Sequence, residues 1–484
     1  MTNCECKNCC MAQEHVKICF QIYNKFKYII DSYVLDFYTD YHWSKLPESW
    51  KKAFENLTPE EISIILDNNV SLDRLKAVCP LSMLALRQVF KIINISRSNF
   101  CVQNLFNMPK HTVYKHADNV EHVENAHIDA NILLNHPRLK NNFWKHISPK
   151  KKHEIMIMAK ICAQIAQHSN CNIVVDFGSG LGHLSRILAY GFGLKVCCLE
   201  AQEYLSEQAK KLDQQFEVTA SKHLTTEQMN KLVRPVHINM TIKNTTDFDC
   251  VAVQVKNAFK LTNDNFKLGI VGLHPCGDLA AILLRFFKSN SNVQFINVAS
   301  CCYMKLTTDE TPISGYPLSR FLSKQEHELC YVARELSCHA IEQYIDRLKA
   351  GRHKELQIHA FRAALENIIV KYHPEKKHMG MRNVKCLDDL TFLEYCNKAT
   401  YGIGLEIPEH DIHSEETMDN LLHWKKVVIF YSLRLMFAPI IETIILLDRF
   451  LYVAEPDVEC RLLPVFDPKL SPRSHILIAM KHVT

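Results

Sequence analysis

One short run near the middle of the chain carries the strongest information about its architecture: Val174-Val175-Asp176-Phe177-Gly178-Ser179-Gly180-Leu181-Gly182-His183. It predicts an apolar strand that ends in a carboxylate, a turn that contains three glycines, and the start of a helix. Glycines at such a turn let a ligand approach the backbone closely, and the N-terminus of the following helix attracts electron-rich groups. The dinucleotide fingerprint G-x-G-x-x-G does not fit, because it needs glycine where this chain has His183.

A second carboxylate follows this run. Glu200 stands 18 residues after Gly182, at the end of the next apolar strand (Lys195–Leu199). A carboxylate in this place can accept hydrogen bonds from both hydroxyls of a ribose. The combination is typical of the nucleoside-binding half of methyltransferases that use S-adenosyl-L-methionine. The predicted cofactor-binding residues are therefore Asp176, Gly178, Ser179, Gly180, Leu181, Gly182 and Glu200. The alternative is that the glycines only tighten the turn.

The composition limits the class of protein and helps to locate the site. Of 484 residues, 47% are hydrophobic and 23% charged, which is typical of globular proteins and excludes disorder or a coiled coil as a description of the whole chain. The net charge of +5 is too small to indicate nucleic-acid binding by itself. Only 13 residues are glycine, and none precedes Gly178. Eight of them fall within 178–193 and 269–277, and this concentration marks a candidate site.

Short apolar runs alternate with helical stretches from Ile173 onward, which predicts an α/β fold with a parallel sheet. The expected strands are Ile173–Phe177, Val196–Leu199, Leu268–Leu273 and Val293–Val298. Two later runs joined by a turn with two prolines predict an antiparallel hairpin at one sheet edge, Cys460–Phe466 and His475–Met480. The region before Asn170 reads as helices, with helix starts after Thr58 and Ser148.

We expect five parts along the chain: a cysteine-rich tail (1–20), an all-helical N-terminal domain (21–145), the first part of the α/β core (146–303), a helical insertion (304–426), and the last helix and hairpin of the core (427–484). Residues 427–447 are the one stretch apolar enough to suggest a membrane span. Arg434, Pro439 and Glu442 interrupt this stretch, and charged side chains are costly inside a bilayer. A buried helix packed on the sheet is the expectation, with no membrane partner.

The cysteines bear on the compartment and on metal binding. The chain has 20 of them without the spacing of a disulfide framework, and its first residues lack a secretory signal. Free thiols in the cytosol and/or the nucleus are therefore expected. Cys4, Cys6, Cys9 and Cys10 are of a residue type that zinc binds, but no second group of Cys or His follows closely. We expect a solvated tail there and assign no metal ligand.

Two further turns would meet the glycine turn if their strands are neighbours in the sheet, because ligands bind beyond the carboxyl ends of the strands. The first turn contains the catalytic candidates His274, Cys276 and Asp278, with His274 as the natural base. The second contains candidates for lining the substrate pocket, which are Cys301, Cys302 and Tyr303. Alternatively, His274 and the cysteines bind zinc, or the adjacent cysteines are small apolar packing residues.

A basic run lies between the N-terminal domain and the core. The run, residues 138–152, holds six basic residues and two aromatic ones without an acid, and its candidates for nucleic-acid contact are Lys145, Lys150, Lys151 and Lys152. Such a run can follow a phosphate backbone and offer rings on which bases stack. The alternative is a solvated helix entry with no ligand.

Several motifs together carry a family resemblance: 42–50 (HWSKLPESW), 148–154 (SPKKKHE), 176–183, 272–278, 301–306, 315–319 (GYPLS), 438–447 and 470–473 (LSPR). With them the chain resembles the methyltransferase-like protein 25 family, most of all its branch formerly named for a ribosomal RNA adenine dimethylase domain. The resemblance runs from Tyr23 to Met480. It implies a seven-stranded Rossmann-like methyltransferase core whose last two strands form the hairpin, and S-adenosyl-L-methionine as cofactor. It also implies that the glycine turn holds the cofactor and that Glu200 holds its ribose. Ser300 stands where the family pattern has glycine.

The methyl acceptor is less clearly indicated. Adenine N6 methylation usually pairs with an Asn/Asp-Pro-Pro-Tyr turn, and the turn His274-Pro275-Cys276-Gly277 differs from it. It is more similar to the His-x-Cys-Gly turn of a eukaryotic tRNA 2′-O-methyltransferase, which also carries a Cys-Cys pair downstream. RNA is therefore the leading substrate hypothesis. A protein substrate and a non-catalytic scaffold that holds partners remain the alternatives.

Overall fold

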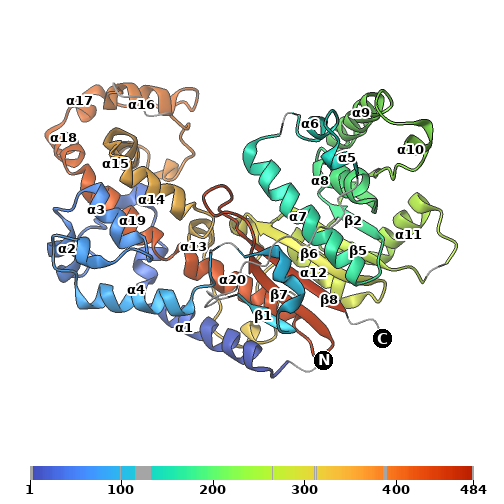
Figure 1. Ribbon diagram of the computed structural model, residues 1–484. Helices are drawn as coiled ribbons and strands as arrows, with labels where there is room; N and C mark the ends of the chain where they lie inside the picture. The colour runs from blue at the N-terminus through green and yellow to red at the C-terminus, as the bar shows by residue number, and fades with distance from the viewer. Residues whose placement is uncertain are drawn as a thin grey trace. The chain divides into compact units, whose positions relative to one another are not determined.

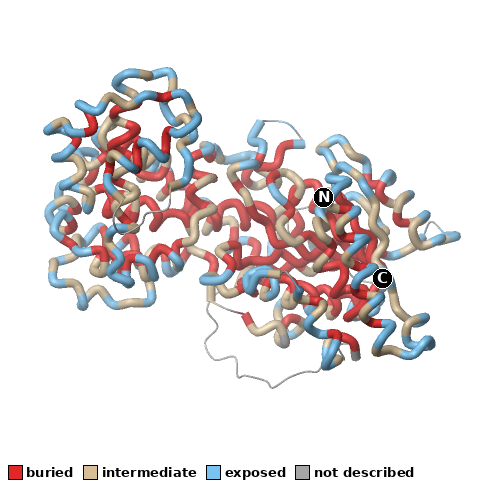
Figure 2. The backbone as a smooth tube through the Cα atoms, turned by 90° about the horizontal axis from the view of Figure 1, so that it is seen from above, coloured by how far each residue is buried: buried red, intermediate tan, exposed pale blue. Residues whose placement is uncertain are grey.

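The computed structural model describes residues 4–98, 100–114, 132–145, 147–263, 265–309, 311, 313–384 and 390–481 (Figure 1). The chain divides into two compact units, each built from separate segments. The sheet unit comprises Met1–Ile18, Ile95–Leu329 and Thr443–Thr484, and the helical unit comprises Cys19–Asn94 and Cys330–Glu442. Figure 2 shows buried segments gathered in the interior of each unit and exposed segments on its outside.

The sheet unit contains a mixed sheet of eight strands in the order β1-β7-β8-β6-β5-β2-β3-β4. The strands are β1 (His111–Val113), β2 (Ile173–Phe177), β3 (Lys195–Glu200), β4 (Val236–Asn239), β5 (Leu268–Cys276), β6 (Val293–Cys301), β7 (Val458–Pro464) and β8 (His475–Lys481). Strands β2 to β6 pair in parallel with one another, whereas β8 runs antiparallel to both β6 and β7. The predicted parallel α/β core and its C-terminal antiparallel hairpin are confirmed.

Strands β2 to β8 form the predicted seven-stranded core, and the eighth strand, β1, comes from the region that was predicted to be all helical. Strand β1 adds to the edge of the sheet, parallel to β7, with His111 opposite Cys460. It is only three residues long, too short for the alternation of apolar and polar residues that identifies a strand in a sequence. The edge of β7 offers unpaired backbone groups, and β1 covers part of it.

Helices cover both faces of the sheet. Helix α7 (Pro149–His168) shares a core with Val174 of β2, and Phe177 of the same strand packs on Phe286 of α12 (Leu279–Ser289). Successive side chains of a strand point to opposite faces, so these positions, three residues apart, place α7 and α12 on opposite sides. The predicted helix start at Ser148 is confirmed, since its hydroxyl accepts a hydrogen bond from the Lys151 amide.

The remaining helices are divided between the two units. The sheet unit also contains α5 (Ile132–Asn135), α6 (Lys140–Phe143), α8 (His183–Arg186), α9 (Glu203–Ala220), α10 (Thr226–Asn230) and α11 (Phe248–Phe259). The helical unit contains α2 (Glu48–Phe54), α3 (Pro59–Leu66), α4 (Leu81–Ile93), α13 (Tyr331–Leu336), α14 (Ile341–Lys349), α15 (His353–Tyr372), α16 (Phe392–Thr400), α17 (Glu409–Ile412), α18 (Glu415–Leu422) and α19 (Trp424–Leu435). Two helices, α1 (Lys7–Ile30) and α20 (Ala438–Val453), contribute residues to both units. Thr58 forms the predicted capping box at the start of α3.

The division into units differs from the predicted boundaries. The predicted N-terminal domain (21–145) passes from the helical unit to the sheet unit at Ile95. The predicted insertion (304–426) belongs to the sheet unit up to Leu329 and to the helical unit from Cys330, and that segment of the helical unit continues to Glu442. Helices of the two predicted parts pack on each other, as α3 does on α14. Each amphipathic helix has to bury its apolar face, and these helices do so together.

The expectation of a solvated tail over residues 1–20 is wrong for the part that the structure describes. Helix α1 begins at Lys7, and Cys9 and Cys19 are buried. Ala12 and Val16 are buried on the same helix at helical spacing. The apolar stripe of α1 therefore packs into the protein. The polar residues that alternate with this stripe in the sequence led to the prediction of a solvated tail.

The apolar stretch 427–447 lies in two consecutive helices, α19 and α20. Residues Trp424–Val453 are long and apolar enough to cross a membrane, with a mean hydropathy of 1.7, but 89% of that apolar window is buried inside the protein. Arg434 is 3% exposed, and its guanidinium donates to the carbonyls of Ile30 and Val332. Buried core helices meet the same criteria of length and hydropathy, so the stretch is weak support for a membrane span.

Candidate active site

The glycine turn connects β2 to α8 in the left-handed backbone conformation that glycine permits. The φ angles of Gly178, Gly180 and Gly182 are +69°, +55° and +68°. A Cβ atom on Gly182 would stand 2.9 Å from the His237 ring, so a side chain there would force His237 to move. A Cβ atom on Gly180 would meet nothing within 4 Å, so the space above this residue is open. The turn is thus packed against the protein at Gly182 and has open space beside it at Gly180.

Glu200 is brought to this turn, as its spacing predicted. One carboxylate oxygen accepts the Gly180 amide at 2.9 Å, and the other accepts the Gln202 amide at 2.9 Å. The amides of Gly178 and Ser179 donate to the Leu199 carbonyl at 2.9 and 3.2 Å. The end of β3 therefore fixes the path of the turn, and Glu200 is held at its rim.

Asp176 lies below the turn rather than in the open space. It is 2% exposed and accepts a hydrogen bond of 2.5 Å from the Ser185 hydroxyl in α8. Burial raises the pKa of Asp176 to about 6, against the opposite effect of the Ser185 hydrogen bond. The acid next to the last residue of β2 thus holds α8, the first helix after the turn.

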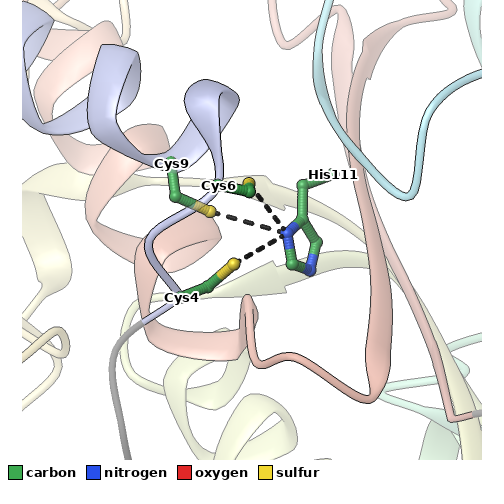
Figure 3. Close-up of side chains that lie close together, drawn as sticks. All are labelled: Cys4, Cys6, Cys9 and His111. Atoms are coloured by element: carbon green, nitrogen blue, oxygen red, sulfur yellow. Dashed lines mark hydrogen bonds between the residues drawn. The ribbon is translucent and has the colours of Figure 1, made fainter.

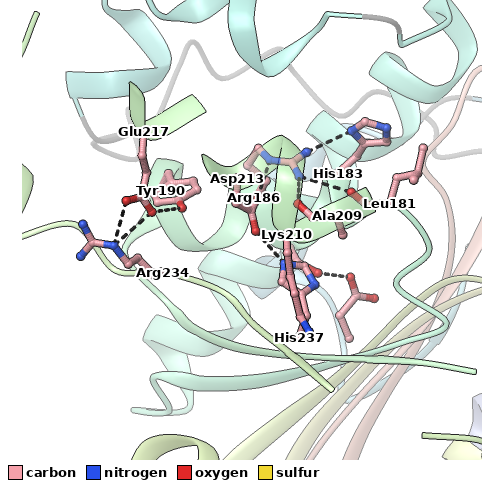
Figure 4. Close-up of polar contacts among 12 residues, drawn as sticks. Leu181, His183, Arg186, Tyr190, Ala209, Lys210, Asp213, Glu217, Arg234 and His237 are labelled. Carbon is pink, nitrogen blue, oxygen red and sulfur yellow. Dashed lines mark hydrogen bonds and ion pairs between the residues drawn. The ribbon is translucent and has the colours of Figure 1, made fainter. Parts of the chain in front are cut away.

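An ion-pair network that the sequence analysis missed supports the turn from outside (Figure 4). The buried Arg186 guanidinium lies 2.6 Å from Asp213, and it donates to the Leu181 carbonyl at 3.3 Å. Asp213 also pairs with His237 at 2.6 Å. A charged residue on an amphipathic helix is expected to be solvated, so no local signal in the sequence indicated that Arg186 is buried and braces the turn.

The residues of the turn fit a nucleoside. The Ser179 hydroxyl oxygen is buried and has no hydrogen-bond partner among the described residues. Buried polar atoms are nearly always paired, so this oxygen is suited to a ligand that supplies the missing partner. With the open space at Gly180 and the rim carboxylate of Glu200, the turn offers groups for the hydroxyls of a ribose.

At the end of β5, the predicted base His274 pairs with a residue of α7. Its Nε2 atom lies 3.0 Å from Glu154, whose other oxygen accepts a 2.5 Å hydrogen bond from the Ser471 hydroxyl. Although burial of Glu154 opposes its charge, the hydrogen bond from His274 holds the pKa of this carboxyl below its ordinary value. His274 has the left-handed φ of +67°, which is rare for a residue with a side chain. Such strain clusters at functional sites.

The predicted cysteines of the two turns meet. The Cys276 sulfur lies 3.2 Å from that of Cys301 and 3.5 Å from that of Cys302. The hydrogen bond from Cys301 lowers the pKa of Cys276 to about 6, whereas the pKa of Cys301 is raised for the same reason. The three sulfurs are close enough to share a metal ion, but His274 does not belong to this group. The arrangement favours a thiolate at Cys276 with two thiols beside it.

Asp278 and Tyr303 have structural partners. The carboxylate of Asp278 accepts from the Thr307 amide at 2.9 Å, the Thr307 hydroxyl at 2.7 Å and the Asn244 amide nitrogen at 3.0 Å. Tyr303 is 1% exposed, and its ring packs 5.5 Å from the Arg449 guanidinium. The structure therefore places Tyr303 inside the protein and uses Asp278 to tie the β5–α12 turn to Thr307.

The predicted basic residues are all solvent-exposed: Lys150, Lys151 and Lys152 lie in the first turn of α7, and Lys145 lies in the turn before this helix. The Lys152 ammonium stacks on the Trp144 ring at 5.3 Å. The Lys150 ammonium is 3.9 Å from Glu154, the residue that holds His274. The basic run and the predicted base therefore lie at the same end of the sheet, with one carboxylate between them.

The sheet unit is where all predicted site residues lie. A separate cavity of about 530 Å³ belongs to the helical unit and is lined by Tyr38, Trp43 and Lys371, among others. The sequence analysis did not indicate it, because its lining comes from short segments far apart in the chain.

Comparisons with known proteins show what the chain is similar to. Residues 150–309 match a family model described as a methyltransferase domain. The chain is 34% identical over 231 residues to "Probable methyltransferase-like protein 25" of Mus musculus, which covers 44% of this chain and 37% of that protein. It is 33% identical over 230 residues to the Homo sapiens protein of the same name, which covers 44% of this chain and 36% of that protein. The chain thus spans little more than a third of the length of these relatives. Residues 150–309 form a methyltransferase domain, and the chain that carries it is a relative of methyltransferase-like protein 25.

Proposed function

We propose that the protein transfers a methyl group from S-adenosyl-L-methionine, with RNA as the acceptor. The observation that supports this cofactor is the open space at Gly180, which lies beside the Glu200 carboxylate that the Gly180 amide holds. Glu200 would hold the ribose hydroxyls, and the Ser179 hydroxyl would find a partner in the ligand. When bound, the cofactor supplies an electrophilic methyl group on a positively charged sulfur.

The residues at the end of β5 suit an acceptor that has to lose a proton. Glu154 engages the Nε2 atom of His274, which leaves Nδ1 to take the proton of an acceptor hydroxyl. His274 would take the proton of the acceptor O–H bond at Nδ1, and the acceptor oxygen would use its electron pair to bond the methyl carbon while the methyl–sulfur bond breaks and leaves its electron pair on the sulfur. Glu154 orients the ring and stabilises the imidazolium, so it is a positioning residue.

The basic run supports RNA as the acceptor. Lys150, Lys151 and Lys152 are exposed beside the residue that holds His274, and Trp144 offers a ring. A phosphate backbone bound there would bring a nearby ribose hydroxyl to the end of β5. A protein acceptor remains the second candidate, because its hydroxyl or amine could use the same base. We also propose the cytosol or the nucleus as the compartment, because the described cysteines are free thiols.

Calorimetry tests the cofactor. We expect S-adenosyl-L-methionine to bind the wild-type chain and not Gly180→Asp, whose side chain would fill the open space with a negative charge. Gly193→Asp is the matched control, since Gly193 has a similar φ of +72° and equally open surroundings but lies outside the turn. Folded wild-type protein that binds no cofactor contradicts the proposal.

Labelling tests the acceptor. Lysate treated with the enzyme and a radioactive methyl donor is digested with ribonuclease or protease, and the label should disappear with ribonuclease. A label that survives ribonuclease and is released by protease overturns RNA in favour of protein. His274→Ala should lose activity and keep cofactor affinity. A protein that binds the cofactor but labels nothing would be the non-catalytic scaffold.

A further inference from the structure

Three cysteines of the N-terminal segment surround one histidine of the sheet edge (Figure 3). The sulfurs of Cys4, Cys6 and Cys9 lie 3.2, 3.2 and 3.7 Å from the Nδ1 atom of His111. All four ligand atoms lie within 4.8 Å of one another. More than 100 residues separate the cysteines from the histidine in the chain. The missing second half of the cysteine motif is therefore a single histidine brought to it by the fold.

The orientation of His111 prepares its Nδ1 atom for a metal. Its Nε2 atom lies 2.8 Å from the Val458 carbonyl and 3.1 Å from the Glu455 carbonyl. Carbonyl oxygens only accept, so Nε2 carries the hydrogen and Nδ1 presents a lone pair to the three sulfurs. Metal-binding histidines almost always donate their second ring nitrogen to a carbonyl or carboxylate in this way.

The distances suit a tetrahedral ion better than hydrogen bonds. One nitrogen lone pair can accept one S–H hydrogen, yet three sulfurs converge on it. Zinc binds cysteine sulfur at about 2.3 Å and histidine nitrogen at about 2.0–2.1 Å, so a tetrahedral site separates sulfur from nitrogen by about 3.5 Å. The three observed separations, 3.2, 3.2 and 3.7 Å, lie around this value.

We propose that Cys4, Cys6, Cys9 and His111 bind one structural zinc ion. Four protein ligands close the coordination sphere, which is typical of structural and not of catalytic zinc. The ion would join the start of α1 to β1, and the Asn8 side chain already donates to the His111 carbonyl. Strand β1 is three residues long and stands at the sheet edge, so a metal clamp would stabilise an element that has few backbone pairs of its own.

Metal analysis of the full chain tests the proposal. Protein loaded with zinc and dialysed is expected to hold about one ion per chain. Cys6→Ser is expected to lose it, and Cys10→Ser is the matched control. Cys10 is exposed on α1, four residues after Cys6, and its thiol donates to the Glu5 carbonyl outside the cluster. Cys276→Ser should also keep the ion, which separates this site from the cysteines of the active site.

Two further measurements do not depend on the folding of a variant. Cobalt added to the metal-free wild-type chain should give the visible bands of tetrahedral cobalt and a thiolate-to-cobalt band, and zinc should displace them. A chelator should lower the Tm of the wild-type chain, and zinc should restore it. Wild-type protein that takes up no zinc overturns the proposal. So does zinc retained by Cys6→Ser, or zinc lost equally from Cys10→Ser.

Discussion

The carboxylate of Glu200 accepts the backbone amide of Gly180 at 2.9 Å, which joins the end of β3 to the centre of the turn after β2. The two strands are neighbours in the sheet, with Phe177 opposite Leu199, so their carboxyl ends emerge side by side. A residue that fixes the turn is thereby also the residue placed to hold a ribose. Backbone shape and ligand recognition depend on the same side chain.

Glu200→Ala is expected to weaken the binding of S-adenosyl-L-methionine by about 10- to 100-fold, because hydrogen bonds to a charged group contribute about 1.5–3 kcal/mol. Calorimetry on the purified chain measures the change in Kd. Glu207→Ala is the control, since Glu207 is exposed on α9 and pairs only with Lys210 among the described contacts. An unchanged Kd for Glu200→Ala would remove this residue from the cofactor site.

Asp176→Asn should stabilise the protein in a pH-dependent way. Burial raises the pKa of Asp176 from 3.8 to about 6, so its favourable contribution is complete below pH 3.8 and is lost as the pH rises through about 6. Above that pH a negative charge is buried, and asparagine removes the charge while it can still accept from Ser185. We expect a Tm higher by about 2–4 °C at pH 7.5 and no gain near pH 4. Thermal melts of both proteins at both pH values measure this, and a gain at pH 4 as large as that at pH 7.5 argues against the buried charge.

Cys276 should react as a thiolate at neutral pH. Its pKa is lowered from 9.0 to about 6 by the hydrogen bond from Cys301, so alkylation by iodoacetamide should level off above about pH 7. The rate is followed by mass spectrometry of the peptide that contains Cys276. In Cys301→Ala the plateau should move to higher pH. A wild-type rate that keeps rising tenfold per pH unit up to pH 9 is the behaviour of an ordinary thiol and refutes the prediction.

We expect the basic run to contribute to the salt dependence of RNA binding. Replacing Lys151 by alanine should weaken binding similarly for different RNA sequences and reduce the slope of log K against log salt by about 1. Filter binding across a salt series measures the slope. Lys195→Ala is the control, because Lys195 is exposed at the start of β3, the opposite end of the strand from Glu200. Equal slopes for Lys151→Ala and the wild-type chain would exclude a phosphate contact at Lys151.

Local signals were enough for the core of the fold. The strand that contains Asp176, the glycine turn, the acid at Glu200 and the helix start at Ser148 each depend on residues close together in the chain. The apolar runs that form strands, turn conformation and helix capping are set by neighbouring residues, so their patterns can be recognised directly. The C-terminal hairpin was predictable for the same reason.

Contacts between distant segments were not predictable in this way. His111 meets the N-terminal cysteines, Glu154 meets His274, and α3 packs on α14. None of these pairs shares a local pattern, because each partner is chosen by the packing of elements that are more than 100 residues apart. The sheet and the glycine turn could therefore be predicted from the sequence, because they depend on residues close together in the chain. The partner of the predicted base, the candidate metal site and the division into units could not, because they form only when distant elements pack together.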